Sequence, residues 1–199
     1  MANMIEPLLA LTLGYILGSV PFGLVLTKLF NAGDLRAIGS GNIGATNVLR
    51  TGNKGLAAAT LLLDLLKGTA AVMLAAQFLP GTEIFAAAGA FLGHLYPVWL
   101  RFNGGKGVAT YAGIMFGLFW IGGLVYAAVW IASLAAFRIS SLAGLAAAIA
   151  APVAAYYAGY SDMTPMLVGC SLLVFWKHRA NIMRLAAGTE PRIGGASPQ

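Results

Sequence analysis

The chain has 199 residues, of which 59% are hydrophobic and only 9% are charged, and its mean hydropathy is +0.82. This composition excludes a soluble domain of that length and predicts a single-domain, all-α, polytopic integral membrane protein. The net charge of +6 comes from Lys and Arg scattered along membrane flanks, which does not favour a nucleic-acid partner. The single cysteine, Cys170, excludes a disulfide framework and a cysteine metal site.

Three hydrophobic segments in the first half of the chain are predicted to cross the membrane, whose hydrocarbon core is roughly 30 Å thick. They cover residues 7–30, 55–78 and 84–100. The first lacks the basic start of a cleavable signal and is expected to be retained, and Pro21 within it predicts a kinked helix. In the second, Asp64 and Lys67 lie one helical turn apart, a spacing that allows either an internal ion pair or a wall of the functional site.

Charge bias indicates how the second half crosses the membrane. If residues 108–137 formed one helix, the acidic connector at Asp162 would face the cytoplasm and the basic C-terminal segment would face outside. A break near residues 120–123 reverses both and satisfies the positive-inside rule. We therefore expect seven transmembrane helices, some of them short, with the N-terminus outside and the C-terminus in the cytoplasm. The fourth span has about 12 residues, roughly 18 Å of helix, and the last two cover residues 142–158 and 164–176.

Polar residues gather in three blocks, residues 36–54, 93–110 and 177–192, which this topology places on the cytoplasmic side. Their central runs are SGNIGATN, GGKG and KHRANIMR. Glycines allow backbone N–H groups to converge on an oxyanion, and Lys and Arg add positive charge, so the shared chemistry is phosphate binding. The sequence has no metal-ligand cluster and no Ser-His-Asp series, so no metal or other cofactor is expected. Residues 193–199 are predicted to be a disordered tail.

Four stretches carry a resemblance to a known family. In chain order they are GSVPFG, GSGNIGATNVLRTGNKG, GHLYPVWLRFNGGKGVAT and KHRANIMRLAAGTEP. They resemble the signature blocks of the bacterial acyl-phosphate:glycerol-3-phosphate acyltransferase family, PlsY, across residues 14–192. The resemblance implies transfer of a fatty acyl group from acyl phosphate to the 1-hydroxyl of glycerol 3-phosphate, which yields lysophosphatidic acid and inorganic phosphate as the first step of phospholipid synthesis. It also implies a multi-pass enzyme of the bacterial inner membrane, in contact with membrane lipids, whose active site lies at the cytoplasmic face and needs no protein partner.

An acyl phosphate is already activated, so we expect direct transfer without a covalent enzyme intermediate. We predict four catalytic residues: Ser40, Lys106, His178 and Asn181. The residues predicted to bind substrate or phosphate are Arg36, Gly41, Asn42, Gly44, Thr46, Arg50, His94, Gly104, Gly105, Gly107, Arg184 and Glu190. The first block is expected to hold one phosphate and the GGKG turn the other, while His178 and Asn181 orient the attacking glycerol.

Two alternatives stay open at this point. The proton of the attacking hydroxyl is accepted either by His178 or by the leaving phosphate, whose second pKa is also near neutrality, and we favour the phosphate. The alternative function is a transporter or channel for an organic phosphate. Such a protein is expected to place its site near the membrane midplane, whereas most polar residues here cluster at one face.

Overall fold

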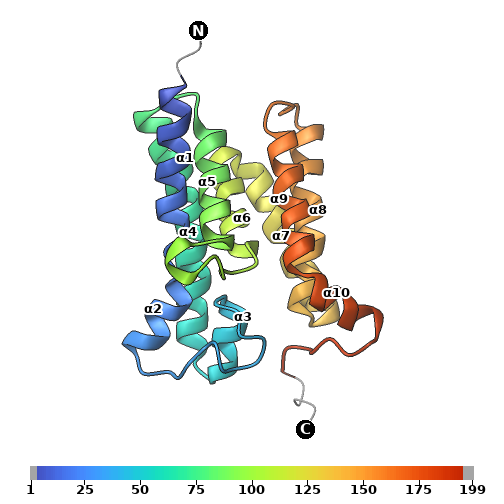
Figure 1. Cartoon of the computed structure of the whole chain (residues 1–199). Coiled ribbons are helices and arrows are strands. Elements are labelled where there is room, and N and C mark those ends of the chain that lie inside the picture. Colours follow the sequence, from blue (N-terminus) through green and yellow to red (C-terminus); the bar gives the residue numbers. More distant parts are fainter. Residues whose placement is uncertain (1–3, 195–199) are drawn as a thin grey trace. The chain divides into compact units, whose positions relative to one another are not determined.

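The computed structural model describes residues 4–194, and every regular element within that range is a helix (Figure 1). Contacts between residues divide the chain into two compact units, one ending at Leu118 and the other beginning at Phe119. The predicted disordered tail lies outside the described residues from residue 195 onward.

The first unit contains six α-helices and two short 3₁₀ turns. In chain order these are α1 (Ile5–Gly18), α2 (Phe22–Leu29), α3 (Ala45–Val48), η1 (Leu49–Thr51), α4 (Lys54–Phe78), α5 (Glu83–Leu95), η2 (Val98–Leu100) and α6 (Val108–Leu118). The strongest pairing is between α1 and α5. Gly14 and Gly18 lie four residues apart on α1, as do Gly89 and Gly93 on α5, and a Cβ on any of them would overlap a carbonyl group of the facing helix. Small residues at this spacing allow two backbones to approach closely in a membrane.

The predicted kink at Pro21 is a full break between α1 and α2. α1 ends at Gly18 and α2 begins at Phe22. Because proline has no N–H and disfavours a helical residue before it, the chain leaves the helix here. The carbonyl oxygen of Val20, within the break, accepts a hydrogen bond from Lys67 Nζ at 2.8 Å. The break therefore joins the first segment to α4.

The second unit contains α7 (Trp120–Phe137), α8 (Ser140–Tyr157), α9 (Thr164–Lys177) and α10 (Arg179–Ala186). Each of the first three helices packs on its neighbour in the sequence, and Figure 1 shows α8 and α9 side by side. Ser171 Oγ on α9 donates a 2.6 Å hydrogen bond to the Ala148 carbonyl on α8. The short α10 follows α9 directly and carries half of the third polar block.

Five helical segments among the described residues are long and apolar enough to cross a membrane. They are Ile5–Leu29, Lys54–Phe78, Glu83–Leu100, Trp120–Phe137 and Ser140–Tyr157, and the shorter apolar helices are Val108–Leu118 and Thr164–Lys177. Large apolar side chains on them, such as Leu62, Ile131 and Leu172, are exposed, as lipid-facing side chains are. The predicted break in residues 108–137 occurs at Phe119, whose extended backbone (φ −160°) separates α6 from α7.

Candidate functional site

The first polar block folds into a loop that Arg36 closes and connects to the second block. Its guanidinium donates through Nη1 to the Gly41 carbonyl at 3.0 Å and through Nη2 to the Asn103 carbonyl. Gly41 has a φ of +65°, a left-handed conformation that favours glycine. Since Asn103 lies in the second block, one side chain ties the SGNIGATN loop to the segment that leads into GGKG.

Asn47 supports the same loop from inside, and the sequence analysis did not single it out as a site residue. Its side chain is almost fully buried, its Nδ2 donates to the Leu35 carbonyl at 2.9 Å, and its Oδ1 accepts the Ser40 N–H at 3.3 Å. Asn42 forms a local turn, because its Oδ1 accepts the Gly44 N–H at 3.0 Å. The motif contains two asparagines, Asn42 and Asn47, and only the fold shows that Asn47 is the one whose side chain is buried inside the loop.

The exposed polar groups of the first block lie around this framework. Ser40, Thr46 and Arg50 are exposed, while Asn42 and Gly44 are partly buried. The Arg50 side chain lies against Gly39, where a Cβ would overlap its guanidinium. The structure therefore presents hydroxyls and a guanidinium to solvent above a backbone that internal hydrogen bonds hold in place.

The GGKG turn of the second block is clamped onto the end of α5. Gly104 N–H donates to the Leu95 carbonyl at 3.1 Å, and Gly105 N–H donates to the His94 carbonyl at 2.9 Å. These carbonyls belong to the last turn of α5, which has no helical donors for them. Both amides that the sequence analysis assigned to a phosphate are thus engaged by α5. Lys106, which is partly exposed, follows directly after this clamp.

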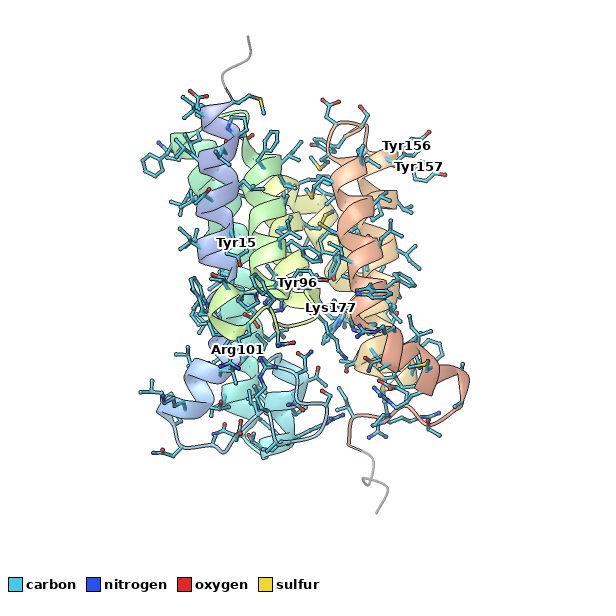
Figure 2. All side chains as sticks on the ribbon, viewed as in Figure 1. Tyr15, Tyr96, Arg101, Tyr156, Tyr157 and Lys177 are labelled. Atoms are coloured by element: carbon cyan, nitrogen blue, oxygen red, sulfur yellow. The ribbon has the colours of Figure 1, made fainter. Side chains whose placement is uncertain are left out.

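The start of the same loop is anchored to Tyr15 on α1 and to Ser19, the residue that follows α1. The Tyr15 hydroxyl donates to the Tyr96 carbonyl at 2.8 Å and accepts the Val98 N–H at 3.1 Å. Trp99 Nε1 donates to the Ser19 carbonyl at 2.8 Å. Figure 2 shows Tyr15 and Tyr96 close together in the first unit. The second block is therefore fixed by contacts with α1, α5 and Arg36.

His94 lies in the interior of the first unit beside two charged residues. Only 4% of it is exposed, and its imidazole packs against Gly105, where a Cβ would overlap Nε2. Its Nδ1 is 3.7 Å from Asp64 Oδ1, which in turn is 2.6 Å from Lys67 Nζ. Asp64 and Lys67 thus form the internal ion pair that their spacing allowed. Asp64 also lies next to His94, which is one of the predicted site residues.

The third polar block, in the second unit, is organised around the carboxylate of Glu190. Glu190 Oε1 accepts hydrogen bonds from Ser141 Oγ at 2.6 Å and from Asn181 Nδ2 at 2.5 Å, and Oε2 accepts from Arg184 Nε at 2.7 Å. Burial alone would raise the pKa of Glu190, but these hydrogen bonds and the positive charge of Arg184 outweigh it and hold the pKa below its ordinary value. Three of the predicted residues, Asn181, Arg184 and Glu190, are brought together here, and Ser141 is an addition that the sequence analysis missed.

His178 occupies the junction between α9 and α10. It is 2% exposed, and its Nδ1 is 2.8 Å from the Val174 carbonyl. Because a carbonyl only accepts hydrogen bonds, the neutral imidazole carries its proton on Nδ1 and its lone pair on Nε2. The residue that follows, Arg179, donates to the Trp176 carbonyl at 3.1 Å and lies over the Trp176 ring.

Taken one unit at a time, the structure places basic side chains on the blocks that are predicted to bind phosphate. The first unit offers Arg36, Arg50 and Lys106 on glycine-rich loops, and the second offers Lys177 and Arg184 on and after α9. Arg and Lys in such settings bind phosphate oxygens through charge-assisted hydrogen bonds. Among residues 4–194 no group of three or more His, Cys, Asp or Glu side chains is placed to hold a metal ion.

Comparison with known proteins identifies the family to which this chain is similar. Residues 8–188 match the family model described as glycerol-3-phosphate acyltransferase. The chain is 61% identical to a glycerol-3-phosphate acyltransferase of Mesorhizobium japonicum (94% of this chain, 96% of the relative) and 55% identical to one of Erythrobacter litoralis (96% of each).

Solved structures agree with this assignment. The fold matches a crystal structure of PlsY, described as an integral membrane glycerol 3-phosphate acyltransferase, in its glycerol 3-phosphate form, with a TM-score of 0.89 and 38% identity over 94% of this chain and 96% of that chain. A structure of PlsY in its lysophosphatidic acid form gives a TM-score of 0.86 and 36% identity over 94% of each chain. An integral membrane protein with these polar blocks, this fold and these relatives belongs to the glycerol-3-phosphate acyltransferase family.

Proposed function

We propose that the protein transfers a fatty acyl group from acyl phosphate to the 1-hydroxyl of glycerol 3-phosphate, producing lysophosphatidic acid and inorganic phosphate. The observation that carries the proposal is the bridge made by Arg36, which joins the hydroxyl-rich loop of the first block to the Lys106 loop of the second. Two neighbouring loops with positive charge suit a reaction in which both substrates carry a phosphate. The relatives solved in glycerol 3-phosphate and lysophosphatidic acid forms support the same substrate and product.

In the first unit, Ser40, Asn42, Thr46 and Arg50 would hold one phosphate, and Lys106 would hold the other. Gly104 and Gly105 contribute by allowing the loop to lie close to α5, and Lys106 supplies the positive charge. An acyl phosphate needs no covalent enzyme intermediate, so alignment and stabilisation of the oxyanion account for catalysis. Positive charge fixed before the reaction stabilises the developing negative charge without reorganisation.

In the second unit, His178 and Asn181 would orient the attacking glycerol, and Arg184 would contact a phosphate. Glu190 serves by holding Asn181 and Arg184 in place. The leaving phosphate accepts the proton of the hydroxyl. Replacing His178 with Gln tests this point: a loss of kcat of about 10²-fold or more, the range of a general base, with unchanged KM values, would assign the proton to His178 instead.

The membrane arrangement forms part of the proposal. The five long segments and two shorter apolar helices supply seven spans, with the N-terminus outside, the C-terminus in the cytoplasm and the polar blocks at the cytoplasmic face of the inner membrane. Within the second unit, Tyr156 and Tyr157 lie at the opposite end from Lys177, which fits aromatic residues at one interface and basic residues at the cytoplasmic one (Figure 2). Residues 1–192 act as one acyltransferase domain that needs no protein partner.

The direct test uses purified protein with palmitoyl phosphate and glycerol 3-phosphate, and measures inorganic phosphate and lysophosphatidic acid together. Equal amounts of both products are expected from the wild type, and Lys106→Ala is expected to abolish them. Lys28→Ala is the matched control, because it removes an exposed charge at the end of α2, outside the three blocks, and leaves turnover unchanged. Phosphate release without lysophosphatidic acid would identify a hydrolase and refute the transfer reaction.

A further inference from the structure

A buried polar cluster lies in the interior of the first unit, and two of its members, Asp64 and Lys67, have no part in the proposed function. Asp64 and Lys67 on α4 and His94 on α5 are 3%, 5% and 4% exposed. Charged residues within a membrane span are costly and are usually kept for a function. The ion pair itself does not join α4 to another helix, because both of its members lie on α4.

The cluster is continuous with the loop that carries Lys106. Asp64 Oδ1 lies 3.7 Å from His94 Nδ1, on one side of the imidazole. On the other side, a Cβ at Gly105 would lie 2.7 Å from His94 Cε1 and 3.0 Å from Cδ2, so the ring touches the loop backbone. The His94 carbonyl accepts the Gly105 N–H. One residue therefore contacts the carboxylate through its ring and the GGKG turn through both its ring and its carbonyl.

We propose that Asp64 is a positioning residue: through His94 it sets where the Gly104–Gly105 segment rests on α5, and hence where Lys106 is presented. The ring lies between a carboxylate oxygen, 3.7 Å from its Nδ1, and a glycine at its far edge, so a change of ring orientation displaces the loop. Lys67 holds the carboxylate in place from its anchor on the Val20 carbonyl. This inference rests on the proposed function for its catalytic consequence, but the loop position itself is independent of activity.

Two double variants separate this role from simple charge pairing. Asp64→Asn with Lys67→Met removes both charges and keeps a polar oxygen facing His94. Asp64→Leu with Lys67→Met removes the same charges and the oxygen as well. Replacing a buried ion pair by uncharged side chains of similar volume is often neutral for stability, so both proteins are expected to fold. His94→Phe, which keeps a ring against Gly105 and leaves the ion pair intact, provides a further variant if the Leu protein unfolds.

The first measurement is hydrogen exchange of the peptide covering residues 101–107, which contains the Gly104 and Gly105 amides. The Leu variant and His94→Phe are expected to exchange about tenfold faster than the wild type, the effect of weakening a hydrogen bond by about 1.4 kcal/mol, while the Asn variant stays near the wild type. Thr60→Val is the control, since the Thr60 hydroxyl is buried on α4 but bonds within that helix. Equal exchange in the two double variants would overturn the proposal.

The second measurement is steady-state kinetics with acyl phosphate and glycerol 3-phosphate. The Leu variant is expected to raise the KM for one of the two substrates by about tenfold and to leave the other KM unchanged, because it displaces only the Lys106 loop. Equal changes in both KM values would indicate general loosening and overturn the role. If the wild type shows no turnover but the exchange difference appears, the proposed function fails and the positioning role stands.

Discussion

Gly105→Ala tests the close packing of the GGKG turn on α5. The added methyl carbon would overlap Nε2 of His94 and lie 2.7 Å from Cε1, where ordinary contacts between carbon atoms are about 3.5–4.0 Å. His94 is buried and cannot swing into solvent. Either the ring moves by roughly 1.5 Å or the loop lifts from α5.

Both responses lead to a similar energetic cost. If the loop lifts, it loses the hydrogen bonds from Gly104 N–H to Leu95 and from Gly105 N–H to His94, each contributing about 1 kcal/mol. If the ring moves instead, overpacking a well-packed interior costs about 1–3 kcal/mol. The expected destabilisation is therefore about 2 kcal/mol, which lowers the unfolding temperature of a chain of this size by about 4–8 °C. A loop displaced by this amount also lowers kcat/KM by about 10²-fold, because it carries Lys106.

Thermal unfolding in detergent and the acyl-transfer assay measure the two effects. The matched control is Gly169→Ala on α9, where a Cβ would meet no atom within 4 Å, so the substitution is expected to stabilise the helix by about 0.5–1 kcal/mol. An Ala variant of Gly105 that unfolds at the wild-type temperature with wild-type kcat/KM would refute the packing argument. Lower activity without lower stability would point instead to direct contact between this segment and a substrate.

Three further predictions concern hydrogen bonds within each unit. Glu190→Gln is expected to destabilise by about 1 kcal/mol at pH 7. Because the folded-state pKa of Glu190 is depressed, its contribution is present above the ordinary pKa of 4.5 and is lost as the pH falls through the lower folded value. The unfolding curves of wild type and variant should therefore converge once the pH is below that folded value. Arg36→Ala should lower kcat/KM by about tenfold with little loss of stability, since the side chain is exposed. Arg36→Lys should not restore kcat/KM, because one ammonium group cannot reproduce a planar guanidinium that reaches two carbonyls. Steady-state kinetics of both variants test this prediction. Asn47→Ala leaves the buried Leu35 carbonyl unpaired and should cost about 1–3 kcal/mol in thermal unfolding, whereas an unchanged unfolding temperature would mean that water replaces the amide.

The sequence alone determined the class of structure and the family. Hydropathy over a span of about 20 residues decides whether a segment enters a membrane, and that property is local. The predicted spans at residues 55–78 and 164–176 therefore differ from α4 and α9 by only one residue at one end. A kink at Pro21 was predicted from proline geometry, and a break near residues 120–123 was predicted from the charge bias of the flanking loops. The structure has a full break at Pro21 and a break at Phe119. The long motif blocks predicted the family, which the comparisons confirm.

The tertiary structure decided what the polar residues do within those blocks. A glycine in a motif looks the same whether its N–H faces a phosphate or a helix end, and only the fold shows that Gly104 and Gly105 cap α5. Arg36 reaches a carbonyl 67 residues away, and Glu190 gathers partners from α8 and α10, so neither contact has a local signature. Such pairings depend on which backbone groups folding leaves without a helical partner, because each of these must find a donor or acceptor elsewhere.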